Sequence, residues 1–129
     1  MKKWLAIGIL IFLAVIISIV FLRGSEDSWI KDKNGIYVKH GVPSETPTEV
    51  YEQQQAIECA RGLYAQAKNS GMQFSSQCLG TCKNYAVDIV HAPRTAEDNL
   101  IENQCEDYRE GKVVHFIELD KDGEVVKIV

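Results

Sequence analysis

Basic residues are in short supply in this 129-residue sequence. Lysine and arginine number 14 against 18 acidic residues, which gives a formal net charge of −4. Three of the basic residues flank an apolar run: Lys2, Lys3 and Arg23. Without them, 11 basic and 18 acidic residues remain, which gives a net charge of −7. Because an acidic domain repels the phosphate backbone, we expect no nucleic-acid partner. The same balance argues against adhesion to anionic lipid beyond the apolar run itself.

Several common catalytic motifs are also missing. The chain contains no G-x-S-x-G, no phosphate-binding loop and no H-E-x-x-H, which are the signatures of many hydrolases, nucleotide-binding proteins and zinc proteases. Asp120 to Gly123 resembles part of a calcium loop. If Glu118 is its first position, however, the twelfth falls on Val129, which cannot coordinate. The sequence therefore predicts no metal and no other cofactor.

One long apolar run is present, Trp4 to Leu22, and it carries no charge. As a helix its 19 residues would span roughly 28 Å, close to the hydrocarbon core of a bilayer. Secretory signal cores are shorter and end at a small-x-small cleavage site, whereas here large residues precede Arg23. We expect a transmembrane signal anchor over residues 1–23. The alternatives are a cleaved signal peptide and a buried core helix.

The charges beside the run predict its orientation. Lys2 and Lys3 precede it, whereas Arg23 is followed by Glu26 and Asp27. The positive-inside rule then keeps the N-terminus in the cytoplasm. We expect a single-pass protein of the cell membrane that contacts the bilayer through residues 4–22. A polar junction (24–28) and an extracytoplasmic domain (29–129) follow.

Turn signals and helix signals predict the fold of that domain. Two short segments between β-prone stretches end in turn dipeptides: Asp32 to Gly35 ends in Asn-Gly, and Asp120 to Gly123 ends in Asp-Gly. Such turns are typical of hairpins. Shared turn chemistry explains their similarity better than a degenerate repeat does. Between them, Thr46-Pro47-Thr48-Glu49 resembles a capping box with proline at the first helical position, which predicts a helix over 47–68.

The remaining pattern completes an α+β fold. Residues 85–91 read as a strand, and an N-cap signal at Thr95 predicts a short helix that extends to about Arg109. The expected order is hairpin, long helix, strand, short helix, hairpin. Strands grouped around one helix suggest a small antiparallel sheet packed on the long helix, with the helices on one face.

Four cysteines, Cys59, Cys78, Cys82 and Cys105, all lie in the part expected to be exported. Oxidising compartments favour disulfides, so two structural disulfides are expected, in any of three connectivities. A redox pair of Cys78 and Cys82 is an alternative, although their C-x₃-C spacing is not that of thioredoxin-like proteins. A four-cysteine zinc site is a weaker alternative because Cys59 and Cys105 are isolated.

A candidate polar site consists of His91, Arg94, Asp98 and His115. Asp88 and His91 are three residues apart, as are His115 and Glu118, so on straight strands the members of each pair would face opposite sides. Hydrogen bonding within a loop is therefore the simpler interpretation. A hydrolase built on His91 and His115 is the catalytic alternative.

Parts of the chain resemble small uncharacterised archaeal proteins that have an N-terminal membrane segment. The resemblance lies in Tyr85 to Arg94, Asp98-Asn99, Glu102 to Cys105 and His115 to Asp120, and it covers roughly residues 45–129. It indicates a source group and no activity. Those proteins carry cysteines that match Cys78 and Cys105, which implies that these two pair and leaves Cys59 with Cys82.

The sequence as a whole favours a membrane-tethered, non-enzymatic binding or structural module of the cell envelope. The candidate partners are the bilayer and a protein of the envelope. An extracytoplasmic thiol–disulfide protein that uses Cys78 and Cys82 is the alternative function, and the His-based hydrolase comes after it.

Overall fold

The computed structural model describes residues 2–23 and 27–129. Residues 24–26 of the expected junction therefore lie outside the described residues. The chain divides into two compact units, one of residues 1–30 and 38–46 and one of residues 31–37 and 47–129. The fold is α+β, as the sequence predicts.

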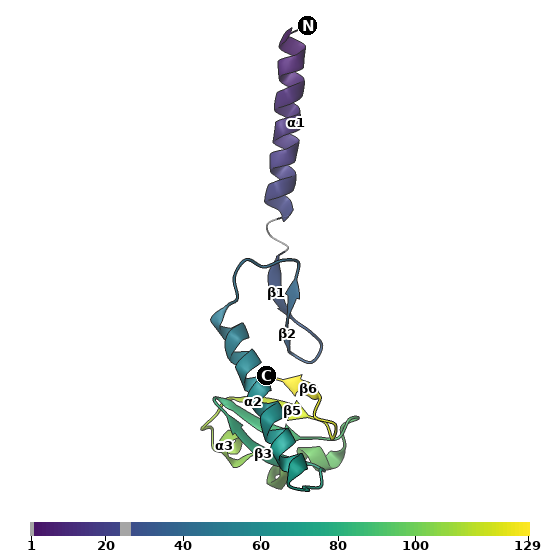
Figure 1. Ribbon diagram of the computed structural model, residues 1–129, viewed down its shortest axis with the longest axis vertical. Coiled ribbons are helices and arrows are strands. Elements are labelled where there is room, and N and C mark those ends of the chain that lie inside the picture. Colours follow the sequence, from purple (N-terminus) through teal and green to yellow (C-terminus); the bar gives the residue numbers. More distant parts are fainter. Residues whose placement is uncertain (1, 24–26) are drawn as a thin grey trace. The chain divides into compact units, whose positions relative to one another are not determined.

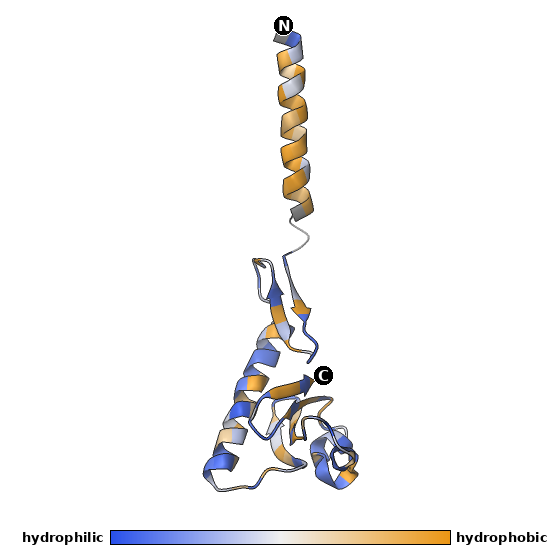
Figure 2. Cartoon of the chain, turned by 90° about the vertical axis from the view of Figure 1, so that its right-hand side faces the viewer, coloured by the Kyte–Doolittle hydropathy of each residue, from blue (hydrophilic) through white to orange (hydrophobic). Residues whose placement is uncertain are grey.

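The first helix, α1 (Lys2–Arg23), contains the apolar run. Its stretch Lys3–Leu22 is long and apolar enough to cross a membrane, with a mean hydropathy of 3.3 over its most apolar window. None of that window is buried among the described residues, unlike the core helix of a soluble protein. Most of α1 has the colour of hydrophobic residues in Figure 2, and every residue from Trp4 to Leu22 is exposed, which is typical of a helix that faces lipid.

A two-stranded sheet of β1 (Ser28–Lys31) and β2 (Tyr37–His40) confirms the first expected hairpin. The Asp32 carboxylate fixes the turn by accepting hydrogen bonds from the backbone N–H groups of Asn34 at 2.8 Å and Ile36 at 2.9 Å. Gly35 has a φ of +85°, which is the conformation that the Asn-Gly signal requires.

The long helix α2 (Thr48–Asn69) confirms the prediction almost to the residue, but it begins differently. Pro47 is the N-cap with ψ of 153°, so the expected capping box around Thr46 does not form. An extended proline cannot also be the first helical residue, and its carbonyl instead accepts the N–H of Val50 at 3.1 Å. One helix face is buried, and it consists of Val50, Gln53, Ala56, Ile57, Ala60, Tyr64 and Ala67.

A four-stranded sheet follows, in the order β3 (Gln77–Cys82), β4 (Tyr85–Ile89), β5 (His115–Leu119) and β6 (Val125–Ile128). The outer pairs are antiparallel, but β4 and β5 are parallel, which corrects the wholly antiparallel sheet that we expected. Parallel neighbours need a long crossover, and the segment between Ile89 and His115 provides it. The strand β3 was not expected, because its sequence QCLGTC contains glycine and lacks the alternation of a strand.

The crossover covers the sheet face opposite α2, so the helices do not lie on one face as expected (Figure 1). Val87, Ile89, Ile117 and Leu119 pack with α2. On the other face, a second cluster consists of Ala86, Cys105, Val113 and Phe116. The expected short helix is divided into η1 (Ala96–Asn99), η2 (Ile101–Asn103) and α3 (Glu106–Arg109). Extended backbone at Leu100 and Gln104 separates these turns.

Two disulfides fasten β3 from opposite faces. Cys82 is bonded to Cys59 on α2, and Cys78 is bonded to Cys105 on the crossover. This is the pairing that the resemblance implies. Residues four apart on a regular strand face the same side, but a β-bulge between Cys78 and Gly80 adds one residue and turns the two cysteines to opposite faces.

Candidate functional site

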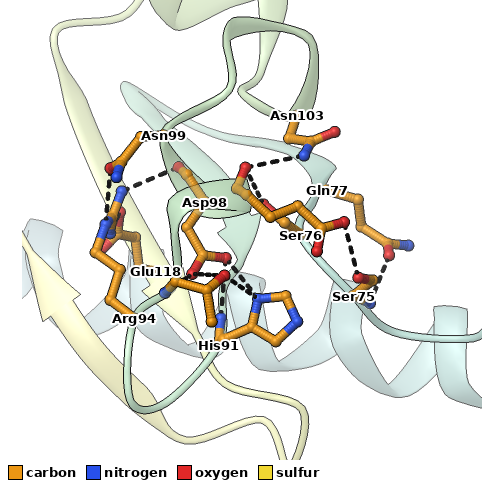
Figure 3. Close-up of polar contacts among 11 residues, drawn as sticks. Ser75, Ser76, Gln77, His91, Arg94, Asp98, Asn99, Asn103 and Glu118 are labelled. Carbon is orange, nitrogen blue, oxygen red and sulfur yellow. Dashed lines mark hydrogen bonds and ion pairs between the residues drawn. The ribbon is translucent and has the colours of Figure 1, made fainter.

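The buried carboxylate of Asp98 organises the polar part of the crossover (Figure 3). Its side chain accepts hydrogen bonds from the backbone N–H groups of His91 at 3.0 Å and Thr95 at 2.7 Å. The Nδ1 atom of His91 lies 2.9 Å from the same carboxylate. Burial alone would raise the pKa of Asp98, but these hydrogen bonds together hold that pKa well below its usual range. Asp98 is therefore ionised, and we assign the proton between it and His91 to Nδ1.

Arg94 connects this loop to the sheet. Its Nη1 lies 2.5 Å from Oε1 of Glu118 on β5, while Nε donates to Asn99 and Nη2 donates to the carbonyl oxygen of Asp98. Figure 3 shows the guanidinium between Glu118 and the loop. All three guanidinium nitrogens are thus engaged within the protein, and Arg94 positions Glu118.

Asp88 lies beside Glu118 on the neighbouring strand. The two are partners in the parallel register of β4 and β5, so their side chains share the sheet face that the crossover covers. Oδ1 of Asp88 accepts the backbone N–H of Cys105 at 3.1 Å. Burial raises the pKa of Asp88 to about 6; the Cys105 hydrogen bond and Arg94 oppose this rise, and the charge of Glu118 adds to it.

A cavity of about 230 Å³ opens between these carboxylates and the crossover. We call it the Asp88 cleft, and its polar and aromatic lining includes Asp88, Arg94, Asn103, Tyr108, Phe116 and Glu118. Asp88 and Glu118 are only 9% and 7% exposed. The ring of Phe116 meets Tyr108 edge-on at 5.4 Å, and on its face lies the Nζ of Lys127, also at 5.4 Å. The cleft therefore combines buried carboxylates with an aromatic wall.

Three of the four residues of the predicted polar site come together: His91, Arg94 and Asp98. His115 does not join them, because it begins β5 opposite Tyr85, against whose ring it stacks at 4.9 Å. His91 lies six residues beyond Tyr85, or about 20 Å along the strand direction. A hydrolase that needs both imidazoles is therefore wrong.

Asp88 and Glu118 were not predicted to lie together. The alternation of side chains relates residues within one strand, whereas these two meet across neighbouring strands. The signal that could have found them is the matched pair of segments Tyr85–Ile89 and His115–Leu119, in which each acid is the fourth residue.

The cysteine alternatives are also decided by the geometry. Cys78 and Cys82 are each bonded to another cysteine, and the described residues contain no free cysteine. A redox pair of Cys78 with Cys82 is therefore wrong. The potential ligand atoms of Cys78, Asp88 and Cys105 lie within 4.8 Å of one another, but a disulfide has no thiolate with which to bind a metal.

The hydroxyl of Thr95 lies 3.2 Å from Nδ1 of His91, which is the same nitrogen that contacts Asp98. Comparisons of the chain with protein-family models, curated proteins and solved structures find no match. The arrangement of the cleft is thus the basis for a functional proposal, and the resemblance to archaeal proteins stays a prediction.

Proposed function

We propose that this chain is a membrane-tethered, extracytoplasmic module that binds a small cationic ligand in the Asp88 cleft without transforming it. The observation that carries this proposal is the second carboxylate oxygen of Asp88. Oδ1 accepts a hydrogen bond from Cys105, whereas none of the described hydrogen bonds uses Oδ2. Every fully buried side-chain oxygen among the described residues has a hydrogen-bond partner, so Oδ2 keeps some exposure, and a ligand in the cleft that brings a donor and a positive charge can reach it.

The charges around Asp88 favour a cation over an anion. Each guanidinium nitrogen of Arg94 already donates one hydrogen bond within the protein, to Asn99, Glu118 and the Asp98 carbonyl oxygen, and the Glu118 carboxylate offsets its charge. Lys127, which also lines the cleft, already places its ammonium against the Phe116 ring, so Tyr108 is the aromatic residue of the wall that is left for a bound cation. A bound amine would find carboxylates on one side and an aromatic ring on the other.

The size of the cleft supports a compact ligand. Pockets for drug-sized molecules hold about 300–1,000 Å³, and this cleft holds about 230 Å³. A primary amine with a few heavy atoms fits this volume. The proposed class of ligand is therefore a small primary amine.

The setting of the proposal is the outer side of a membrane. An apolar helix of membrane-spanning length and two disulfides fit an anchored domain in an oxidising compartment. The orientation follows from the lysines before the helix and is part of the proposal. A protein partner in the envelope is a further proposal, which is not tied to a particular surface of the described residues.

Calorimetric titration of the full-length protein in nanodiscs would test the cleft. The probes are ethylamine and ethanolamine, with ethanol and acetate as the matched neutral and anionic compounds. We expect heat of binding for the two amines only. Because ionised Asp88 is required and its pKa is about 6, the affinity should rise about tenfold from pH 5 to pH 7.5.

Two variants make the result specific. Asp88→Asn keeps an oxygen for the Cys105 N–H but removes the charge, so amine binding should be lost. Asp122→Asn removes the same charge from an exposed turn and should leave binding unchanged. Equal binding of acetate and ethylamine, or full binding by Asp88→Asn, would show that the proposal is wrong.

A further inference from the structure

A second cavity opens at one end of the four-stranded sheet, where three loops meet. Gln77 at the start of β3 and Leu119 at the end of β5 are both paired with Ile89 at the end of β4. The loop before β3, the loop after β4 and the turn after β5 therefore converge at this end. Between them lies a space of about 360 Å³, which we call the His91 cavity. Its volume is within the range of about 300–1,000 Å³ that is usual for ligand pockets.

The walls of the His91 cavity are mostly apolar. Ile89 and Val90 are almost completely buried, at 1% and 5% exposure. The ring of Phe74 is held by stacking on Tyr64, with 4.9 Å between the ring centroids. Five apolar residues line the cavity in all: Phe74, Ile89, Val90, Ala92 and Pro93. Such walls favour a ligand with an apolar body.

Four polar side chains also line the cavity, and three of them already donate hydrogen bonds to carboxylates of the protein, namely those of Ser75, Thr95 and Lys121. The fourth is His91. Its Nδ1 contacts Asp98 and Thr95, whereas none of the described hydrogen bonds uses its Nε2. Figure 3 shows this second ring nitrogen pointing away from Asp98. The polar atom of the cavity that is left for a ligand is therefore Nε2.

The proton assigned to Nδ1 decides what Nε2 can do. A neutral imidazole that carries its proton on Nδ1 has a lone pair on Nε2, which accepts a hydrogen bond. Asp98 fixes the direction of this lone pair, because its carboxylate accepts the backbone N–H of His91 at 3.0 Å and lies 2.9 Å from Nδ1. The acceptor is thus oriented before a ligand arrives.

The charges beside the cavity favour an uncharged ligand. None of the described residues that line it is acidic, so an amine would find no counter-ion there and would meet the ammonium of Lys121. A carboxylate would turn its own lone pairs toward that of Nε2. A hydroxyl group instead brings one donor without a charge.

We propose that the His91 cavity binds an uncharged aromatic alcohol, a phenol, whose hydroxyl donates a hydrogen bond to Nε2 of His91. The aromatic ring packs against the apolar walls beside Phe74. The His91 cavity and the Asp88 cleft share Ile89 and Val90 but no polar side chain. The proposal is therefore independent of amine binding, and either one can fail without the other.

Nuclear magnetic resonance of the full-length protein in nanodiscs would test the contact directly. The chain has three histidines, so with ¹⁵N-labelled histidine the signals of His40 and His115 serve as references in the same spectrum. Phenol is added at pH 8, and the methyl signals of Ile89 and Val90 report occupancy of the cavity. We expect the Nε2 signal of His91 to move upfield, as it does when a bare ring nitrogen accepts a hydrogen bond, while the two reference signals stay in place.

A matched ligand and matched variants isolate the hydrogen bond. Anisole has the same ring but no hydroxyl donor, so it should bind about tenfold more weakly than phenol and cause no upfield shift. His91→Phe removes the acceptor and should weaken the binding of phenol about tenfold, whereas His115→Phe should not change it. Asp88→Asn should also leave phenol binding unchanged, which separates this test from that of amine binding.

Three outcomes would overturn the proposal. The first is an absence of any response of the Ile89 and Val90 methyl signals to phenol, and the second is an equal shift of Nε2 by anisole. The third is binding of benzoate or benzylamine as tight as that of phenol. The comparison of ligands uses the unchanged protein, so a misfolded His91→Phe variant would not leave the question open.

Discussion

Replacing Asp88 by asparagine should stabilise the protein, and the gain should depend on pH. The Asp88 side chain is 9% exposed, and burial raises its pKa from 3.8 to about 6. Asparagine has nearly the same shape, and its oxygen can still accept the N–H of Cys105. The variant therefore removes the buried charge and leaves the hydrogen bond in place.

The sign and size of the effect follow from proton linkage. Between pH 4 and pH 6 folded Asp88 binds more protons than unfolded Asp88, so the free energy of unfolding falls as the pH rises through this window. The shift of about two pKa units corresponds to a loss of about 3 kcal/mol at pH 7.5. At pH 4 the loss is about 0.5 kcal/mol. Asp88→Asn should recover these amounts.

Urea unfolding followed by circular dichroism would measure the effect. The full chain is studied in nonionic detergent with its disulfides intact, and both proteins are compared at pH 4 and pH 7.5. We expect a much larger gain at pH 7.5 than at pH 4. A gain that is equal at the two pH values, or a loss at pH 7.5, would mean that the carboxylate is not destabilised by burial.

Three further changes should affect stability. Asp98→Ala leaves two backbone N–H groups without their acceptor and should lower the free energy of unfolding by about 3 kcal/mol at pH 7. The fold lowers the pKa of Asp98, so this difference should shrink as the pH falls below 4 in the same urea assay. Cys59→Ser with Cys82→Ser opens a disulfide with a sequence separation of 23 and should lower the free energy of unfolding by about 3.5 kcal/mol; an unchanged urea midpoint would contradict this. Tyr64→Phe removes a 2.9 Å hydrogen bond to the Lys121 carbonyl oxygen and should cost about 1 kcal/mol in thermal unfolding, whereas Tyr51→Phe, at an exposed position of the same helix, should cost little.

Local signals in the sequence predicted the elements that depend on local chemistry. The Asn34-Gly35 and Asp122-Gly123 turns, the apolar face of α2 and the apolar run of α1 were all expected, because each reflects a few neighbouring residues. The helix of about fifteen residues expected after Thr95 was wrong. Its first turn is present as η1, but extended backbone at Leu100 ends it, and no residue pattern there indicates the break.

Features that depend on distant residues could not be predicted in the same way. The bulge at Leu79 decides which face Cys78 occupies, and it exists only in the pairing of β3 with β4. Asp88 and Glu118 are thirty positions apart and meet only because β4 and β5 are parallel and in register. His115 was grouped with His91 by residue type alone, and the same register separates them.

The two disulfides have a consequence for proteolysis of the chain. Cys59–Cys82 and Cys78–Cys105 close overlapping loops. A protease that makes a single cut anywhere between Cys59 and Cys105 would leave two fragments still joined by at least one bridge. A cut between α1 and Cys59 would separate the whole Asp88 cleft from α1. The exposed positions Met72 and Pro93 could therefore be cut while both fragments stayed joined through a disulfide.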